Sequence, residues 1–599
     1  MNKLKNASSV IGNIFYFVRL MFSISPVFVI LEMIWGLITR APGRLIGVLG
    51  MKYIIDVVES GENLERIWIG VGAIAAVLVV SHLLSWLYTE FYWNIAKEKL
   101  SAGLSKKLYE KAREIDLQEY DNPDFYNDFI LNIESSTESI QYLLGNVKAY
   151  FTELVLFFTI GAVIFTIDPV CLLIIVVTVV VFLPLSRIIS NLRVGRRKDN
   201  AELHHRSDYF QRIFYLQDYT KEVRMNNISP LLIDRYNEAA DAVIENQNKY
   251  WKKLSFFSWL QETGMDVLGL MFVLSAYLGY CVLVKHSIGA GDFVATFNGA
   301  YQIAASINIL TIWAVTVFSE RGKIIEKYRE FLACEPKIKG GTETASCDKP
   351  ETIEIRNLSF TYPGSDHPVL KNINLTIKPY EKIALVGYNG AGKTTLTNLL
   401  LRLYEPTEGG IYIGGKNIKD VTLESHKDRF SAVFQDFQNY ACTIGENVAL
   451  DVNPDEGRVI QALKHSGFSK PLKNGVDTEI LREFDDNGTM LSGGESQKMA
   501  VARAFYKDCP YAILDEPSAN LDPIAEYELN KTMLEAAEHK TVIFISHRLS
   551  TTVGADKIYV MADGEIIESG SHAELMEKNG TYAYMFNLQA EKYLAADDK

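Results

Sequence analysis

Six long apolar stretches in the first half of the chain constrain its fold more than any other feature. A helix that crosses a bilayer needs roughly 20 mostly apolar residues. Stretches of that length run over residues 26–48, 67–88, 147–167, 170–189, 256–284 and 293–318. The helices of a soluble bundle would each need a polar face, and these stretches mostly lack one. We therefore expect an all-α transmembrane domain of six helices.

The connections between these stretches indicate how the chain is oriented in the membrane. Connections one, three and five are short, whereas connections two and four run for dozens of residues and must lie together on one side. The long connections carry basic residues such as Lys106, Lys107, Arg196 and Arg197, while the first short connection is acidic. Because Lys and Arg are retained on the cytoplasmic side, we expect the long connections and both termini in the cytoplasm of a plasma-membrane protein. Residues 10–22 are expected to form an amphipathic helix at the membrane surface.

Polar residues recur at intervals of four within the first and last apolar stretches. They are Glu32, Arg40 and Arg44, with Gly36 completing the series, and Asn298, Gln302 and Ser306. Residues four apart share a helix face, and a charged side chain at mid-bilayer costs ~3 kcal/mol or more unless it meets water or a partner. Our hypothesis is that these faces line a translocation pathway, where Glu32, Arg40, Arg44, Asn298 and Gln302 contact the substrate. The alternative is that the polar residues pair with one another or lie beyond the hydrocarbon.

A glycine-rich loop dominates the second half of the chain: Gly387-Tyr388-Asn389-Gly390-Ala391-Gly392-Lys393-Thr394-Thr395. It follows the apolar run 383–386 and precedes the Leu-rich stretch 396–403, which predicts a strand before the loop and a helix after it. Its glycines allow backbone N–H groups to close around phosphate oxygens, and the helix directs its positive N-terminus at the same anion. Lys393 would reach the outer phosphates, and Thr394 would offer a hydroxyl to Mg²⁺.

Composition divides the chain into two domains. Residues 1–335 form the expected transmembrane domain, and residues 336–350 are rich in Lys, Gly, Thr and Ser, which is typical of a linker. From residue 351 onward, strand patterns alternate with helical patterns. We therefore expect an α/β phosphate-loop ATPase domain over residues 351–599, with a late hairpin at 557–569 turned by Asp563-Gly564.

Four further motifs follow the glycine-rich loop. They are Leu491-Ser492-Gly493-Gly494-Glu495-Ser496-Gln497, Tyr511-Ala512-Ile513-Leu514-Asp515-Glu516-Pro517, Ser518-Ala519-Asn520-Leu521-Asp522 and Ile545-Ser546-His547-Arg548. In this order and context they resemble the ATP-binding cassette (ABC) family, and six spans ahead of the ATPase resemble its exporter-type half-transporters. The resemblance implies ATP and Mg²⁺ as cofactors. It also implies dimerisation, because one chain carries half of each of two composite ATP sites. A homodimer is favoured, and a heterodimer with a second half-transporter chain is the alternative.

The resemblance also assigns roles to individual residues. Glu516 would polarise the attacking water, His547 would orient the γ-phosphate, and Gln435 would touch Mg²⁺ and face the coupling helices. Asp515, together with Thr394 and Gln435, would hold the metal and its hydration shell. The implied nucleotide contacts are Tyr362, which would stack on adenine, and Gly387, Asn389, Gly390, Gly392, Lys393, Thr394 and Thr395. The implied contacts to the partner's nucleotide are Ser492, Gly493, Gly494 and Glu495.

The segments that would transmit nucleotide state to the membrane are also implied by the resemblance. Short transverse coupling helices are expected at 120–125 and 216–222. The chain departs from the family pattern nearby, because the usual Glu-Arg-Gly triplet before the signature is replaced by the stretch 483–490. Cross-talk between ATPase and coupling helices is therefore expected to be built differently. A second departure is Glu495, which stands where Gln is common.

The expected function is ATP-driven export of a peptide, lipid or amphipathic small molecule by alternating access. An importer on the same fold, for example for metal chelates, and an ATP-gated or regulatory membrane protein are the alternatives. A net charge of -13 argues against nucleic-acid binding, which needs a basic face. The six cysteines lack metal or redox spacing, and the first, Cys171, falls within a span, so no N-terminal cysteine peptidase is expected. The expected partners are membrane lipid, a second half-transporter chain and the substrate.

Overall fold

The computed structural model describes residues 2–61, 64–316, 322–517, 526, 531, 539–546 and 548–597. The chain divides into two compact units. The helical unit comprises Met1–Arg113 and Asn127–Cys334, and the sheet unit comprises Glu114–Tyr126 and Glu335–Lys599. The sheet unit thus includes a short segment from the second connection between the apolar stretches.

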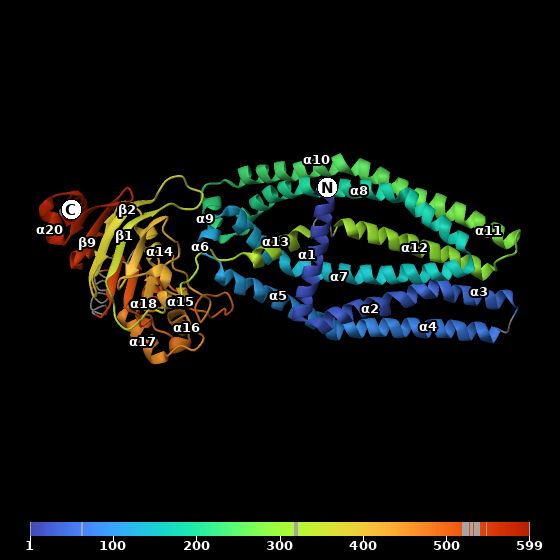
Figure 1. Cartoon of the computed structure of the whole chain (residues 1–599), viewed down its shortest axis with the longest axis horizontal. Coiled ribbons are helices and arrows are strands. Elements are labelled where there is room, and N and C mark those ends of the chain that lie inside the picture. Colours follow the sequence, from blue (N-terminus) through green and yellow to red (C-terminus); the bar gives the residue numbers. More distant parts are fainter. Residues whose placement is uncertain are drawn as a thin grey trace. The chain divides into compact units, whose positions relative to one another are not determined.

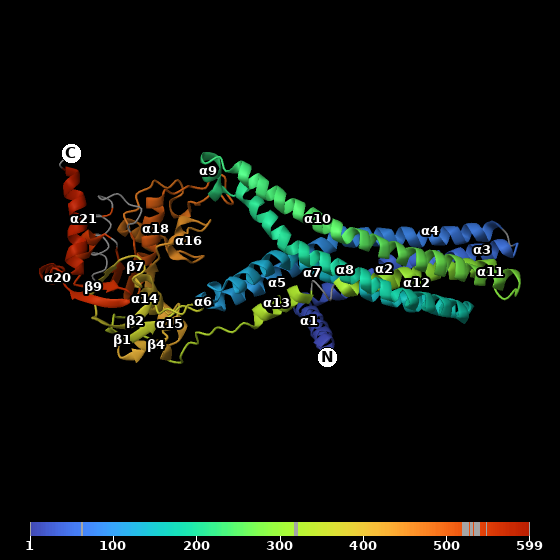
Figure 2. The same cartoon turned by 90° about the horizontal axis from the view of Figure 1, so that it is seen from above.

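The helical unit is a bundle of long helices that run alongside one another, except for α1, which crosses them at a steep angle (Figures 1 and 2). In chain order its helices are α1 (Asn2–Ile24), α2 (Pro26–Leu45), α3 (Met51–Glu59), α4 (Leu64–Leu87), α5 (Asn94–Glu114), α7 (Pro123–Ile167), α8 (Pro169–Tyr215), α9 (Gln217–Met225), α10 (Ser229–Glu262), α11 (Ser275–Leu283), α12 (Ala290–Thr316) and α13 (Gly322–Ala333). Three π-helical segments connect neighbouring helices: η1 (Ile46–Gly50), η2 (Tyr88–Trp93) and η3 (Thr263–Leu274). Proline occupies the start of α2 and of α8, where its missing N–H is not needed, and Asp168 caps α8 by accepting a hydrogen bond from Val170 N.

Five helical stretches of the described residues are long and apolar enough to cross a membrane. They are Pro26–Glu59, Leu64–Glu114, Lys148–Ile167, Pro169–Arg197 and Ser229–Leu283. The sixth expected span falls on α12, a helix of 27 residues whose apolar character is diluted by Asn298, Gln302 and Ser306. The 47 residues of α8 span about 70 Å at ~1.5 Å per residue, which is more than twice a ~30 Å hydrocarbon core. The long helices therefore extend well past the bilayer, as the long connections predict.

The sheet unit contains two sheets. The four-stranded antiparallel sheet has the order β2 (Leu370–Ile377), β1 (Ile353–Phe360), β4 (Glu408–Ile413), β5 (Lys416–Asn417). The six-stranded sheet has the order β10 (Glu565–Gly570), β9 (Lys557–Ala562), β3 (Lys382–Gly387), β8 (Thr541–Ile545), β7 (Tyr511–Asp515), β6 (Phe430–Val433). Its strands are parallel except for β10, which pairs with β9 as the predicted hairpin. Positive φ angles at Asp563 and Gly564 provide the turn.

The helices of the sheet unit are α14 (Lys393–Leu400), α15 (Leu423–Asp428), α16 (Ile444–Ala449), α17 (Glu456–His465), α18 (Gly493–Tyr506), α20 (His572–Lys578) and α21 (Thr581–Asp597). Of these, α14, α15, α18 and α20 contact strands of the six-stranded sheet, whereas α16 and α17 pack on α18. Strands β7 and β8 are buried along their whole length, which explains their unbroken apolar sequence. Because β3, β6, β7 and β8 are parallel, their carboxyl ends meet at one edge of the sheet. Ligand sites of such sheets lie at this edge.

Candidate functional site

The glycine-rich loop leaves the carboxyl end of β3 and leads directly into α14. Gly392 precedes α14 with φ of 96°, and a Cβ there would lie 2.5 Å from the Leu370 side chain, so the loop requires glycine at this position. The Lys393 ammonium donates hydrogen bonds to the carbonyl oxygens of Gly387 (2.8 Å) and Tyr388 (3.0 Å). Burial lowers the pKa of Lys393, although Glu516 and Asp515 oppose the shift. The cation is thus held inside the loop, where anionic phosphates would replace the carbonyls.

Asp515 ends β7 beside this loop. Thr394 Oγ1 donates a 3.0 Å hydrogen bond to Asp515 Oδ2, while Asp515 Oδ1 is buried without a hydrogen-bond partner among the described residues. Burial raises the pKa of Asp515 to about 6. A carboxylate oxygen with free lone pairs next to a hydroxyl is the hard oxygen set that Mg²⁺ prefers. The donors therefore fit the metal that the sequence implies.

Glu516 follows in a strained conformation. Its φ is 48°, in the left-handed region that a non-glycine residue rarely occupies. Gln435, two residues after β6, donates from Nε2 to Glu516 Oε2 at 3.3 Å, and Gln497 Nε2 donates to the Glu516 carbonyl oxygen at 3.0 Å. One glutamine therefore holds the Glu516 carboxylate and another holds its backbone. Gln497 belongs to the signature motif, but the sequence did not predict its contact with Glu516.

A cavity of about 720 Å³ lies at this edge. Its lining includes Gly387, Asn389, Gln435, Glu516 and Ser546, with residues of α21 on one side. The structure thus brings the glycine-rich loop, Gln435 and Glu516 together around one space. His547 and the stretch 518–522 lie outside the described residues.

Tyr362 lies at the other end of the glycine-rich loop, in an aromatic cluster. Its hydroxyl is 3.0 Å from Thr395 Oγ1, and its ring meets Phe360 and Tyr404 edge to face, with centroids 4.8 and 5.3 Å apart. The Tyr404 hydroxyl donates a 2.6 Å hydrogen bond to Asp121 Oδ2. Tyr404 therefore connects Tyr362, at the expected adenine site, with Asp121 in the segment Glu114–Tyr126.

The signature stretch begins α18 with a capping box. Ser492 Oγ accepts from Glu495 N at 3.3 Å, and Glu495 Oε2 accepts from Ser492 N at 2.8 Å. The same carboxylate oxygen accepts a 2.8 Å bond from Lys470 Nζ, which is the main cause of its lowered pKa. Lys470 also donates to the Met490 carbonyl oxygen at 2.9 Å. Lys470 compensates for the acid at position 495, and sequence reasoning did not identify it.

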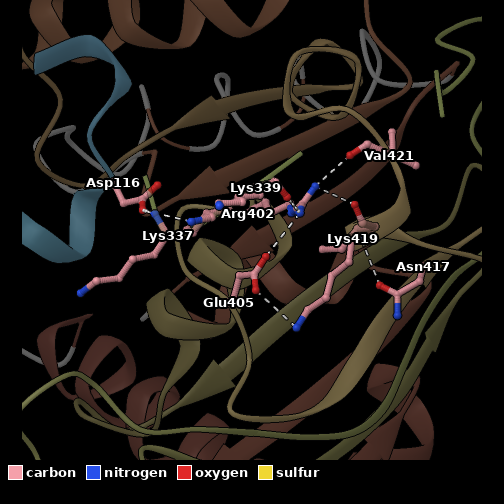
Figure 3. Close-up of polar contacts among 10 residues, drawn as sticks. Asp116, Lys337, Lys339, Arg402, Glu405, Asn417, Lys419 and Val421 are labelled. Atoms are coloured by element: carbon pink, nitrogen blue, oxygen red, sulfur yellow. Dashed lines mark hydrogen bonds and ion pairs between the residues drawn. The ribbon is translucent and has the colours of Figure 1, made fainter. Parts of the chain in front are cut away.

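A polar network fastens the expected linker to the rest of the sheet unit (Figure 3). Asp116 Oδ2 accepts from the backbone N–H groups of Lys337 (2.5 Å) and Ile338 (3.1 Å). The Arg402 guanidinium, almost fully buried, donates to the carbonyl oxygens of Lys339 (2.8 Å), Ile418 (2.8 Å) and Val421 (2.9 Å). Residues 337–343 are therefore attached along the sheet unit instead of hanging free as their composition suggests. The first coupling helix was expected at 120–125, but that range shares only Tyr120 with the short helix α6 (Leu117–Tyr120) and then runs into the start of α7 at Pro123.

The polar residues predicted to contact substrate lie in the helical unit, and several are paired. Glu32 forms an ion pair with Lys148 (3.1 Å), and Arg44 forms one with Glu153 (2.9 Å). Asn298 Nδ2 donates to the Gly47 carbonyl oxygen at 3.0 Å within the π-helical segment η1. Glu32 and Arg44 thus have ion-pair partners within the protein, in line with the alternative that the polar residues of the spans form pairs. Arg40 is half-exposed, and Gln302 is half-buried on α12.

A bundle of membrane-crossing helices fused to a unit with a phosphate loop, an adjacent acid pair and a capped signature helix defines an ATP-driven membrane transporter. The family model described as "ABC transporter" matches residues 370–519, and the model described as "ABC transporter transmembrane region" matches residues 30–305. The chain belongs to the ABC transporter family, which confirms the predicted family and fold class.

Relatives of known role include bacterial exporters. The chain is 28% identical to the subtilin transport ATP-binding protein SpaT of Bacillus subtilis over 84% of this chain and 82% of that protein. It is 28% identical to the nisin transport ATP-binding protein NisT of Lactococcus lactis subsp. lactis over 84% of each. It is 42% identical to the ATP-dependent lipid A-core flippase of Methylobacillus flagellatus, but only over 58% of this chain and 59% of the flippase. The fold is similar to that of a bacterial Atm1-family ABC exporter with ATP bound, with a TM-score of 0.76, 23% identity and coverage of 94% and 98% of the two chains. ATP-driven transport on an exporter fold is therefore the function of this class.

Proposed function

We propose that two copies of this chain form an exporter that hydrolyses MgATP at two composite sites and moves an amphipathic substrate by alternating access. The observation that carries the proposal is the convergence of Lys393, the Thr394–Asp515 pair and the Gln435–Glu516 pair at one sheet edge. The fused membrane helices couple that chemistry to transport. The substrates named for the relatives, two peptides and a lipid, support a peptide or lipid as cargo.

In this proposal each residue at the sheet edge has a distinct task. Lys393 binds the outer phosphates, because its buried ammonium already lies between the loop carbonyls. Thr394 and Asp515 hold Mg²⁺, which neutralises charge on the β- and γ-phosphates when bound. Glu516 orients the attacking water and accepts its proton, and Gln435 positions the Glu516 carboxylate through their hydrogen bond.

The signature stretch supports the dimer. The described lining of the 720 Å³ cavity includes no residue of the stretch 491–495. A second copy would therefore supply Ser492, Gly493, Gly494 and Glu495 to the nucleotide, with the N-terminus of α18 directed at its phosphates. The sheet unit then lies in the cytoplasm, where ATP is available, and the helical unit lies in the plasma membrane.

Transport into inside-out vesicles tests this function. Export predicts ATP-dependent accumulation of cargo inside such vesicles, and import predicts its loss. Glu516→Gln should lower ATP hydrolysis and cargo movement together by roughly 10²-fold or more, because a positioned general base contributes at least that much. Glu408→Gln, which changes an exposed acid of β4, is the matched control and should leave both rates unchanged. Cargo movement that persists in Glu516→Gln without hydrolysis would refute the proposal.

A further inference from the structure

The helical unit holds a cluster of charged and hydroxyl side chains on three neighbouring helices, which run side by side in both views (Figures 1 and 2). Helix α2 contributes Glu32, Arg40 and Arg44, α7 contributes Lys148 and Glu153, and α12 contributes Ser306. Only Glu32, Arg40, Arg44 and Ser306 stand out in the sequence pattern. Glu153 and Lys148 come from a different helix, and their proximity is visible only in the structure.

Both carboxylates of the cluster are buried, and each of their oxygens has a close partner. Glu153 has no exposed surface, and its Oε1 accepts from Arg44 (2.9 Å) while its Oε2 accepts from Ser306 Oγ (2.6 Å). Glu32 is 3% exposed, and its Oε1 accepts from the Tyr88 hydroxyl (2.8 Å) while its Oε2 pairs with Lys148 (3.1 Å). Each buried acid therefore already has one close cation and one hydroxyl.

Arg40 is the third cation facing these two acids. Its guanidinium reaches Glu153 Oε1 only at 3.8 Å, beyond hydrogen-bonding distance, and 46% of its side chain is exposed. The described members of the cluster thus comprise two carboxylates and three cations, which leaves one positive charge in excess. That excess charge is carried by the most exposed member.

The depth of Arg40 makes this excess charge unusual. The apolar span on α7 runs from Lys148 to Ile167, and Glu153 lies five residues, or about 7.5 Å, inside its start. Gly36 fixes α2 at this level, because a Cβ there would lie 2.3 Å from Thr152 Oγ1. The two helices are in direct contact, so Arg40 cannot move far from the wall that Glu153 forms. A charge at this depth is disfavoured unless an anion or water meets it.

We propose that Arg40 is a binding residue for an anionic group, a phosphate or carboxylate, on the amphipathic substrate. The guanidinium carries five N–H donors, and its planar shape allows bidentate hydrogen bonds to a phosphate or carboxylate. Arg44 and Glu153 position it by forming a neutral, buried wall behind it. The inference rests on the proposed function for its place on a transport pathway, and it narrows the cargo to molecules that carry negative charge near an apolar chain.

Binding of radiolabelled dodecyl phosphate to the full-length protein tests the inference without ATP. The protein is held in nanodiscs of phosphatidylcholine, and empty nanodiscs provide the background. Arg40→Gln should weaken binding ~10-fold, as expected for loss of one charge-assisted contact, and Arg40→Glu should weaken it further. Arg40→Lys keeps the charge but not the planar fork, so it should weaken binding less than Arg40→Gln does. Arg187→Gln, which removes an exposed arginine of α8 outside the cluster, is the matched control and should bind like wild type.

Further arms separate the source of the anion and the failure modes. If a lipid headgroup is the occupant, nanodiscs with phosphatidylglycerol should compete with dodecyl phosphate in wild type but not in Arg40→Gln. If only free amphiphile binds, the added lipid should have no effect. Equal affinity of wild type and Arg40→Gln for dodecyl phosphate, or equal weakening by Arg187→Gln, would overturn the inference. Neither result affects the test of the proposed function, which measures ATP hydrolysis and cargo movement in Glu516→Gln.

Discussion

The Tyr404 hydroxyl donates a 2.6 Å hydrogen bond to Asp121, although the two residues are 283 positions apart in the chain. Tyr404 also packs edge to face against Tyr362, the expected adenine platform, so one side chain touches both the nucleotide site and the segment Glu114–Tyr126. Burial raises the pKa of Tyr404, which keeps its hydroxyl a donor at every physiological pH. We infer that this contact links nucleotide occupancy to the segment Glu114–Tyr126, where the first coupling helix was expected.

Tyr404→Phe is therefore expected to reduce coupling more than hydrolysis. The variant keeps the aromatic cluster and removes one hydroxyl, so ATP hydrolysis should change less than 2-fold, while the hydrogen bond it loses is worth ~1 kcal/mol. The measurement is the number of substrate molecules moved per ATP hydrolysed in proteoliposomes, which should fall several-fold. Tyr412→Phe, on β4, removes a hydroxyl without a hydrogen bond among the described residues and is the control. An unchanged ratio in Tyr404→Phe would show that the contact is only structural.

The ion pair between Lys470 and Glu495 explains how an acid is tolerated in the signature stretch. Both side chains are about a quarter exposed, at 25% and 29%, so the pair should contribute no more than ~1 kcal/mol. Glu495→Gln keeps an oxygen that can accept from Ser492 N, whereas Glu495→Ala loses the capping box as well and should cost about 1 kcal/mol more. A double-mutant cycle of Glu495→Gln with Lys470→Gln, followed by thermal unfolding of the full chain, measures the pair itself. A coupling energy near zero would mean that Lys470 is held by the Met490 carbonyl alone.

Mg²⁺ dependence should respond to pH through Asp515. Burial raises the pKa of this carboxyl to about 6, so the group is ionised and able to bind metal above that pH. Below it, protonation competes with the metal, and the apparent Mg²⁺ affinity should fall by about tenfold per pH unit. Mg²⁺ titrations of ATP hydrolysis between pH 5 and pH 8 measure this. Asp515→Asn should weaken Mg²⁺ at all pH values and remove the dependence, and a wild-type affinity that is flat across this range would contradict the assignment.

Most of the fold was predictable because it depends on local pattern. Apolar length gives the membrane helices, and the run from 383 to 403 gives β3, the loop and α14, although α14 begins and ends three residues before the Leu-rich stretch 396–403. The positive φ of Gly392 also follows from local pattern, because a phosphate loop of this kind places glycine where the backbone is left-handed. The π-helical segments η1, η2 and η3 have no comparable signal, because the same apolar residues suit either helix type.

The contacts that join distant segments could not be derived from the sequence. Arg402 looks like a charged residue at the end of α14, and only the fold shows that it binds the carbonyls of Lys339, Ile418 and Val421. Polar residues in the first apolar stretch could equally have lined a cavity or paired. In the structure Glu32 and Arg44 form close ion pairs, whereas Arg40 approaches Glu153 only at 3.8 Å and stays half-exposed. Glu153 is the only acid within the expected span 147–167, but its partners lie on other helices and could not be read from the sequence.

His426 should make the sheet unit sensitive to acid. It is fully buried on α15, its Nε2 donates to the Leu400 carbonyl oxygen at 2.9 Å, and burial lowers its pKa from 6.5 to about 4. Between these values the unfolded chain binds a proton that the folded chain does not, so stability falls as the pH drops from about 6.5 to about 4. The loss amounts to roughly 3 kcal/mol at the low end, from 1.36 kcal/mol per pKa unit. Asp515 opposes this trend below pH 6, because its raised pKa favours the folded, protonated form.

The measurement is therefore the difference in the free energy of urea unfolding between wild type and His426→Gln across pH 4.5–7.5. The variant should lose stability overall but show a smaller decline towards low pH, and parallel pH profiles for the two proteins would rule out His426 as the titrating group.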